Sequence, residues 1–371
     1  MEQLQPDYDI KAILKFAGAF IAWLIGSGFA TGQEILQFFS SYGYASYGIV
    51  LICLFGFLAM AQTLLITGYD QKDNDSFSPY SYFCGRRLGT FYSWIIPAIL
   101  FLLMSVLISG AGATLNEYYG VDSRLGAALM AIMVLCAFLM GFERLIRMVS
   151  AIGPVIILFS LFVGAATLLR DFHNIGEISR FKEVLADKQS TPNWFISSIL
   201  YVSLNFLCGG TYFSALGASA KHRNSAKWGA TLGAGAVILS IAIMNTAILL
   251  NGGNAALLSV PTLYLAKKLS FILGAVFSIV LILGMFSCCS AIMWTVCNRF
   301  SQDGTRRSRI VAAVVACGSF LLGMLPFAKL MAIFYPFVGY MGLPFVACVL
   351  YRSFKNRRAF LLNLKSEKSD L

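Results

Sequence analysis

Charged side chains are scarce in this sequence, and that scarcity excludes an ordinary soluble fold. Asp, Glu, Lys and Arg make up 12% of the 371 residues, whereas 58% are hydrophobic. Soluble domains carry about 25% charged residues, because polar side chains must cover the core. Many apolar runs reach the roughly 20 residues that a helix needs to cross a bilayer. The composition therefore predicts an all-α integral membrane protein.

Residues that carry catalytic or metal chemistry are also few. The two histidines, His173 and His222, fall in predicted links between apolar runs, and none of the nine cysteines forms a C-x-x-C pair. No Ser–His–Asp set, H-E-x-x-H motif or P-loop is recognisable. These absences argue against an enzyme, a zinc site and a resident cofactor. No cleavable signal peptide is recognisable either.

Ten apolar stretches are predicted to span the membrane. They form one transmembrane domain over 1–371, with a C-terminal tail at 353–371. Neither of the longer links is long enough to be a domain of its own. The predicted spans are 12–40, 44–68, 91–116, 124–141, 147–169, 194–219, 227–251, 264–298, 309–326 and 329–352.

Orientation explains the net charge of +11. With the N-terminus in the cytoplasm, the cytoplasmic segments collect 20 of the 28 Lys and Arg residues, and the outer links collect the other 8. The positive-inside rule therefore places both termini in the cytoplasm, which an even number of spans requires. The predicted location is a bacterial cytoplasmic membrane, whose anionic lipid attracts the basic tail weakly. Nucleic acid is not an expected partner.

Two of the spans carry small residues at mid-membrane depth. The first span has Gly26, Ser27 and Gly28, starting 14 residues after the span begins. The sixth has Gly209 and Gly210, starting 15 residues after that span begins. Each glycine costs a helix roughly 1 kcal/mol relative to alanine. Because the two spans run in opposite directions, broken helices at matching depths predict a five-plus-five inverted repeat, over about 12–169 and 194–352.

The same glycines have a second interpretation. Gly28-x-x-x-Gly32 is also a pattern that allows two membrane helices to pack closely. The matching depth in both halves favours broken helices. Backbone freed at a break survives in a membrane only if it is buried in protein or lines a wet cavity. There, exposed carbonyls favour a cation and half-helix N-termini favour a carboxylate.

Two motifs resemble a known family. The run IGSGFATGQEILQFF, followed by Tyr-Gly, and the later run GGTYFSALGA are similar to YkvI-type bacterial membrane proteins. These proteins look like members of the amino acid–polyamine–organocation superfamily, which has the LeuT-type five-plus-five fold with broken first and sixth helices. The resemblance covers nearly the whole chain. It implies a secondary transporter with a substrate site between spans one, three, six and eight.

The resemblance also implies one sodium site. It assigns to that site the carbonyls of Ala22 and Ile25 and the hydroxyls of Ser287 and Ser290. Oxygen ligands suit a hard cation, although membrane serines also bond back to their own helix. Phe29 stands where members with a second sodium site carry a polar residue, which argues against a second ion. The fifth span lacks the Lys that replaces a cation in some proton-coupled relatives, which favours sodium over protons.

The expected substrate site combines backbone at the two breaks with an aromatic wall. Ser105 and Ser109 share one side of the third span, as substrate contacts or as packing. Glu34 lies about 12 Å beyond Gly26, at 1.5 Å per helical residue, and is interpreted as a gate or proton acceptor or as a structural hydrogen-bonding group. A carboxylate in the membrane costs about 2.5–3.5 kcal/mol on insertion scales. The candidate substrate residues are Trp23, Gly26, Ser27, Gly28, Ser105, Ser109, Gly209, Gly210, Thr211 and Phe286.

The sequence thus predicts a sodium-coupled symporter of a small amino-acid-like or amine-like solute. Such a transporter exposes its site alternately to the two sides of the membrane by rocking one helix bundle against the rest. The alternative is a non-transporting ligand sensor on the same fold, like some spore germinant receptors. The sequence specifies neither the solute nor the oligomeric state.

Overall fold

The computed structural model describes residues 9–25, 27–74, 76–140, 152–301 and 305–369. All regular elements in these ranges are helices, as predicted. The elements are α1 (Ile10–Leu24), α2 (Ser27–Ala30), α3 (Gln33–Phe38), η1 (Ser40–Ala45), α4 (Ser46–Asp70), α5 (Pro79–Tyr119), α6 (Ser123–Leu139), α8 (Ile152–Asp171), η2 (Phe172–Phe181), α9 (Lys182–Ala186), α10 (Trp194–Ala218), α11 (Arg223–Leu249), α12 (Gly252–Ala255), α13 (Pro261–Leu269), α14 (Phe271–Phe300), α15 (Arg306–Gly323) and α16 (Phe327–Ser369).

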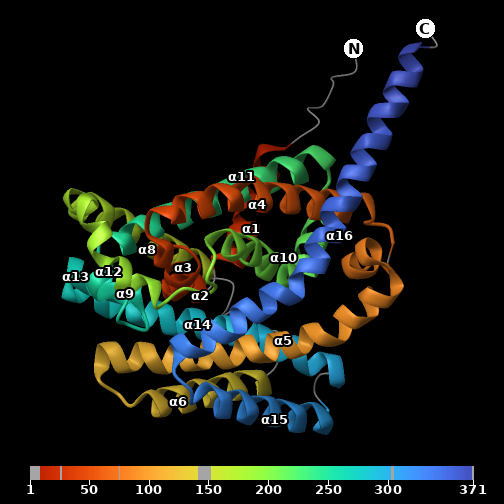
Figure 1. Ribbon diagram of the computed structural model, residues 1–371. Helices are drawn as coiled ribbons and strands as arrows, with labels where there is room; N and C mark the ends of the chain where they lie inside the picture. Colours follow the sequence, from red (N-terminus) through yellow and green to blue (C-terminus); the bar gives the residue numbers. More distant parts are fainter. Residues whose placement is uncertain (1–8, 26, 75, 141–151, 302–304, 370–371) are drawn as a thin grey trace.

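The long helices pack as a bundle around α1, α10 and α14 (Figure 1). On one side, α4 and α11 pack against each other and against α10 and α1 respectively. On the other side, α5 packs against α14, and α6 and α15 cover α5 from outside. The C-terminal part of α16 projects from the bundle. Helices far apart in sequence therefore surround the first helix.

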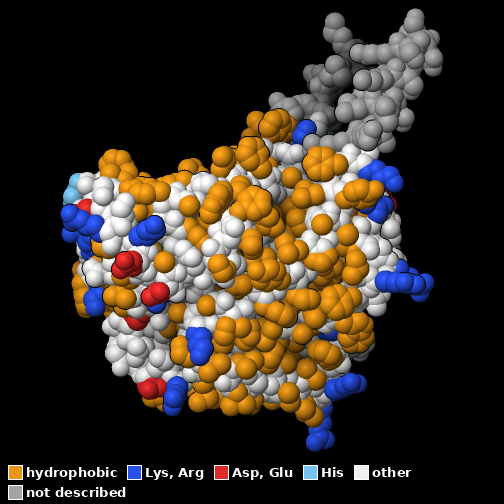
Figure 2. Space-filling model, viewed as in Figure 1, with side chains coloured by type: hydrophobic (Ala, Val, Ile, Leu, Met, Phe, Trp, Pro, Cys, Tyr) orange, Lys and Arg blue, Asp and Glu red, His pale blue; other side chains and the backbone are white. Residues whose placement is uncertain are grey.

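The surface fits a lipid environment. Hydrophobic side chains cover the central face in Figure 2, and Lys and Arg gather towards its ends. Among the described residues, seven helices are long and apolar enough to cross a membrane. The chain is thus a membrane protein. The total of ten spans, with its inverted repeat, stays a prediction.

The first predicted span is broken. Helix α1 ends at Leu24, and Ile25 leaves helical geometry with φ −85° and ψ 63°. The short α2 follows, and a second interruption at Gly32, whose φ is +77°, separates α2 from α3. Gly26 lies outside the described residues, as does the side chain of Ser27. The small-residue cluster therefore ends the helix where the sequence predicts a break.

The predicted break in the sixth span is wrong. Helix α10 continues from Trp194 to Ala218 through Gly209 and Gly210. A Cβ on Gly210 would lie 3.0 Å from the Tyr80 hydroxyl oxygen, so this glycine makes room for a neighbouring side chain. The backbone of α10 also contacts the backbone of α4 beside Gly217. Close packing, the second interpretation of such small residues, explains the sixth-span glycines.

The eighth predicted span, 264–298, is two helices. Helix α13 ends at Leu269, and the extended residue Ser270, with φ −161° and ψ 141°, separates it from α14. Pro261 begins α13, and the N–H of the preceding N-cap residue, Val260, donates to Glu117 at 3.2 Å. The α13 segment is thus a separate element at the end of α14.

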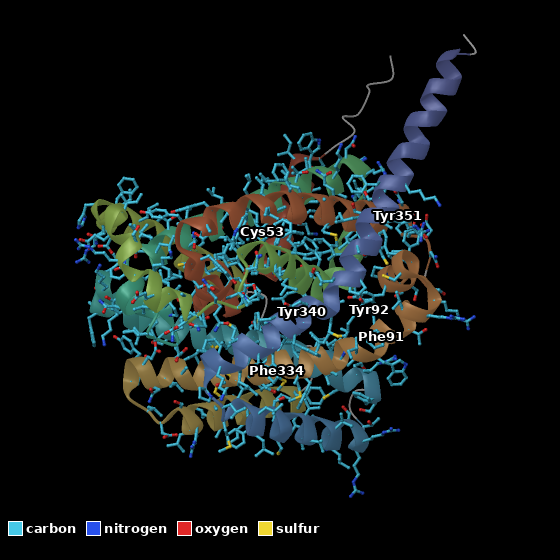
Figure 3. The ribbon with its side chains drawn as sticks, viewed as in Figure 1. Cys53, Phe91, Tyr92, Phe334, Tyr340 and Tyr351 are labelled. Carbon is cyan, nitrogen blue, oxygen red and sulfur yellow. The ribbon has the colours of Figure 1, made fainter. Side chains whose placement is uncertain are left out.

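Helix α5 bends at Gly85, where φ is +78° and ψ is 172°. The bend lets Tyr80 return into the bundle, and its hydroxyl donates to the Leu207 carbonyl of α10 at 2.7 Å. Beyond the bend, the Tyr92 hydroxyl donates to the Met341 carbonyl of α16 at 2.9 Å (Figure 3). These two tyrosines fix α5 against both partner helices.

A charged cluster joins the ends of α8, α11 and α13. Lys268 donates to Asp171 at 2.8 Å and to the Asn251 side-chain oxygen at 2.7 Å. Asn251 in turn donates to Asp171 at 2.9 Å. The Asp171 side chain is 5% exposed and that of Lys268 is 31% exposed. The cluster neutralises a buried carboxylate where three helices meet.

Replacing Lys268 by methionine is expected to lower the free energy of unfolding by about 2 kcal/mol, less than for a fully buried pair because the lysine is partly exposed. Thermal melting of the purified protein in detergent measures the effect. The control is Arg180→Met, which removes an exposed i,i+3 pair with Glu177 and should change stability by less than about 0.5 kcal/mol. Equal melting temperatures for the two variants would contradict the stabilising role of the cluster.

Candidate functional site

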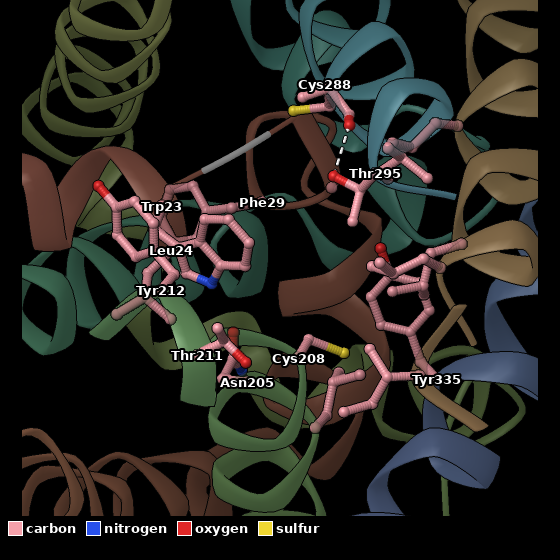
Figure 4. Close-up of a pocket in the computed structure, with 18 of the residues that line it drawn as sticks. Trp23, Leu24, Phe29, Asn205, Cys208, Thr211, Tyr212, Cys288, Thr295 and Tyr335 are labelled. Carbon is pink, nitrogen blue, oxygen red and sulfur yellow. Dashed lines mark hydrogen bonds between the residues drawn. The ribbon is translucent and has the colours of Figure 1, made fainter. Parts of the chain in front are cut away.

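A cavity of about 590 Å³ lies at the end of α1. Figure 4 shows Trp23 and Tyr212 on one side of it and Tyr335 on the opposite side. The helices that border it are α1, α2, α3, α5, α10, α14 and α16. Its lining residues are Ala22, Trp23, Leu24, Gly28, Phe29, Glu34, Tyr80, Ile96, Leu100, Leu103, Leu107, Leu204, Asn205, Cys208, Thr211, Tyr212, Ser287, Cys288, Ala291, Ile292, Thr295 and Tyr335.

Several predicted site residues meet in this cavity. Of the expected substrate contacts, Trp23, Gly28 and Thr211 line it. Ala22 and Ser287, expected at the sodium site, line it as well, as does Glu34. These residues come from spans one, six and eight, three of the four spans implied by the family resemblance, and leucines of the third span also line the cavity.

The two serines of the third span belong to packing. Ser105 donates to the Phe101 carbonyl of its own helix at 3.0 Å. Ser109 donates to the Leu325 carbonyl, just before α16, at 2.7 Å. Neither serine lines the cavity, because the side of α5 that faces it carries leucines. Their hydrogen bonds favour packing, the second of the two interpretations of these serines.

Three further candidates lie outside the cavity lining. Phe286 is 7% exposed, on a side of α14 away from the lining. Gly209 makes space for the ring of Trp23, since a Cβ there would lie 2.8 Å from its indole nitrogen. Gly210 does the same for Tyr80. Phe286, Gly209 and Gly210 therefore do not line the cavity.

The structure adds two tyrosines that the sequence analysis missed. Tyr80 lies before the predicted third span and reaches the cavity only because α5 bends at Gly85. Tyr335 comes from α16, in the tenth predicted span. A tyrosine in the middle of an apolar span was the available signal for Tyr335. No local pattern indicated Tyr80.

An aromatic pair forms one wall. Trp23 stacks on Tyr212 with ring centroids 4.6 Å apart and planes at 14°. The Tyr212 hydroxyl donates to the Ala19 carbonyl of α1 at 3.1 Å. Stacking and the hydrogen bond together hold α1 against α10 just before the break. Trp23 is nevertheless 40% exposed, so much of its surface remains accessible.

Glu34 is the charged group among the described lining residues of the cavity. It is 6% exposed and lies in the first turn of α3. A Cβ on Gly28 would lie 2.8 Å from both the Glu34 Oε2 atom and the Tyr335 hydroxyl oxygen. Tyr201 of α10 is a side-chain hydrogen-bonding neighbour of the carboxyl. The broken first helix thus places a carboxyl among tyrosines.

A candidate cation site lies beside the break. Helix α14 packs against α2, and the Ser290 hydroxyl is buried without a hydrogen-bond partner among the described residues. On the same helix, Thr295 bonds back to the Ala291 carbonyl at 2.8 Å, whereas Ser290 does not. The end of α1 supplies carbonyls without intrahelical donors, and Ile25 there is buried. Buried oxygens of this kind suit a small hard cation.

The broken first helix and the cavity at its break define a helical membrane protein with a candidate ligand site. No protein-family model matches the chain. The chain is 20% identical over 352 residues to the uncharacterised membrane protein YkvI of Bacillus subtilis strain 168, covering 93% of this chain and 97% of YkvI. It is 23% identical over 341 residues to the uncharacterised protein YyaD of the same organism, covering 92% and 96%. The predicted resemblance to YkvI-type proteins is thereby confirmed.

Solved structures identify the fold as LeuT-type. MhsT in complex with L-phenylalanine matches with a TM-score of 0.53 and 14% identity, covering 92% of this chain and 87% of MhsT. A manganese transporter of Eremococcus coleocola matches with a TM-score of 0.53 and 16% identity, covering 92% and 79%. At these identities the likeness establishes the fold alone. It does not identify the substrate or the coupling ion.

Proposed function

We propose that this protein is a secondary active transporter that couples the uptake of a small solute to sodium. The observation that carries the proposal is the cavity at the break of the first helix. Non-helical backbone at membrane depth is tolerated only where it is buried or lines a cavity, and transporters use such breaks to bind ions and solutes. The fold shared with MhsT and the manganese transporter supports this class. We place the protein in the bacterial cytoplasmic membrane with both termini in the cytoplasm, from its distribution of Lys and Arg.

We assign sodium to the carbonyls of Ala22 and Ile25 and the hydroxyls of Ser287 and Ser290. Ala22 and Ser287 share the cavity, and the buried Ser290 hydroxyl lacks a partner in the described part of the chain. A buried hydroxyl that makes no hydrogen bond is costly, and a bound cation would satisfy it. We assign the solute to the adjoining space bounded by Trp23, Gly28 and Thr211, among the other lining residues.

Replacing both Ser287 and Ser290 by alanine is expected to raise the sodium concentration for half-maximal uptake at least tenfold. Two of the four proposed oxygen ligands are removed, while the solute space is retained. The measurement is solute accumulation in proteoliposomes as a function of external sodium. Ser240→Ala on α11 is the matched control, because that hydroxyl bonds back to the Ala236 carbonyl at 2.7 Å. An unchanged sodium response in the double variant would remove both serines from the site.

A ligand sensor on the same fold is the second candidate. The same proteoliposomes discriminate the two, because a sensor binds its ligand without accumulating it. If no solute in a screen of amines and amino acids accumulates under a sodium or a proton gradient, the transporter proposal fails.

A further inference from the structure

The described lining of the cavity carries an acidic side chain and no basic one. Among its described lining residues, Glu34 is the charged side chain, and Lys, Arg and His are absent from the lining. The ion pairs found in the described chain involve Asp70, Asp171 and Glu177, so none of them neutralises Glu34. A solute carboxylate would therefore meet a like charge, whereas a solute cation would meet an opposite one.

The described neighbours of Glu34 supply no positive charge. Tyr201 and Tyr335 are neutral groups that can donate hydrogen bonds. Glu34 is buried, and a buried ionised carboxylate is costly unless it is paired with a positive charge. No basic residue of the described chain supplies that charge, so a ligand can. The carboxyl is thus a candidate binding group for the positively charged end of a solute.

Aromatic rings surround the remainder of the same space. Trp23, Tyr212 and Phe29 line it near the break, and Tyr80 and Tyr335 line it from α5 and α16. The face of an aromatic ring attracts an ammonium group within about 6 Å of the ring centroid, and tryptophan does so best. A carboxylate with several electron-rich rings is a set of groups that binds organic cations.

The far side of the cavity is apolar. Leu100, Leu103 and Leu107 lie on one side of α5, and Ile292 faces them from α14. A charged or zwitterionic tail would lose hydration there without a partner, whereas a hydrocarbon group would gain from burial. The lining therefore fits a molecule with one cationic end and one apolar end.

We propose that the solute is an organic amine, with its ammonium group on Glu34 and the aromatic rings and its hydrocarbon part against the leucines of α5. The proposal rests on the transport function proposed above, and it narrows the amino-acid-like or amine-like solute to the amine. Glu34 then acts as a binding residue, and a free carboxylate on the ligand weakens binding.

Three probes of matched shape test this assignment: 3-methylbutylamine, leucine and 3-methyl-1-butanol. They share a branched hydrocarbon group and carry respectively a cation, a zwitterion and no charge. Binding to the purified protein in detergent is measured by calorimetry and by thermal stabilisation. We expect the amine to bind at least tenfold more tightly than either of the others. Leucine binding as tightly as the amine, or no detectable amine binding, would overturn the proposal.

Variants of Glu34 locate the interaction. In Glu34→Gln, the dissociation constant of the amine should rise at least tenfold while that of the alcohol stays within twofold, and Glu34→Asp should restore part of the amine affinity. The matched control is Glu117→Gln, which removes a carboxyl outside the cavity that accepts from the Ser259 N–H at 2.5 Å. That variant should leave amine affinity within twofold. An unchanged amine affinity in Glu34→Gln, with uptake that no longer responds to a proton gradient, would assign Glu34 to proton transfer and overturn the amine assignment.

These experiments distinguish a failure of the proposed amine site from a failure of the proposed transport function. Amine binding that depends on Glu34 without accumulation in proteoliposomes would overturn the transporter and keep the amine site. Sodium-driven accumulation of leucine, unaffected by Glu34→Gln, would keep the transporter and overturn the amine site.

Discussion

Replacing Gly217 by alanine is expected to destabilise the folded protein strongly in detergent. A Cβ at this position would overlap the carbonyl oxygen of Leu65 on α4, and a Cβ at Gly68 would likewise overlap the carbonyl oxygen of Ser214 on α10. The obstacle is backbone in both cases, so no side-chain rotation relieves it. We expect a loss of about 3 kcal/mol, at the upper end of the usual overpacking penalty. Thermal melting and the monodisperse fraction on size exclusion measure it.

The control is Gly235→Ala on α11, where a new Cβ would meet no atom within 4 Å. That alanine should leave stability unchanged or raise it by about 0.5–1 kcal/mol, because alanine favours a helix over glycine. If Gly217→Ala melts at the wild-type temperature, α4 and α10 separate more easily than their backbone contact indicates.

Replacing Gly32 by alanine is expected to displace α3 and to reduce uptake at least tenfold. Gly32 has a φ of +77°, and a Cβ there would lie 2.7 Å from the Thr262 Cγ2 atom and 3.1 Å from the Thr262 backbone nitrogen. Left-handed backbone costs an alanine about 1–2 kcal/mol, and the contact with Thr262 adds to it. Thr262 also donates to the Ala30 carbonyl, so the second interruption of the first helix is fixed from both sides. Since Glu34 follows two residues later, the cavity loses its carboxyl position.

Two further variants separate strain from contact. Gly120→Ala introduces the backbone strain of a positive φ without a steric contact, because Gly120 has a φ of +69° and open space around it. It should destabilise the protein by about 1–2 kcal/mol and leave uptake intact. Thr262→Ser in the Gly32→Ala background removes the methyl group and should recover part of the uptake. If Gly32→Ala and Gly120→Ala have equal effects on stability and uptake, the contact with Thr262 plays no part.

The predictions from the sequence agree best with the structure for the long helices, whose formation depends mainly on composition. Long apolar runs become long helices because a bilayer offers backbone groups no partners, so each segment must satisfy its own hydrogen bonds. The helices α4, α10 and α11 accordingly fall within a few residues of the predicted ranges. Helix α1 ends at Leu24, just before the small residues where the break is predicted.

The wrong break in the sixth span and the position of Ser105 and Ser109 outside the cavity lining share a cause. A glycine at mid-membrane depth is compatible both with a break and with a close helix contact, and the sequence of α10 does not show that Tyr80 and α4 press against it. Ser105 and Ser109 are likewise compatible with a cavity or with packing, and their acceptors, the carbonyls of Phe101 and Leu325, are set by the neighbouring backbone. In each case the deciding atom belongs to another part of the fold.

By itself, the sequence determined that this chain is a helical membrane protein, that its first long helix is interrupted, and that a carboxyl at position 34 follows the interruption. Those properties depend on hydrophobicity and on local helix chemistry. The tertiary structure alone decided which glycines are packing contacts, that Tyr80 and Tyr335 enter the cavity, and that Glu34 has no basic partner among the described residues. Those properties depend on contacts between helices far apart in the chain, and composition and spacing do not encode such contacts locally.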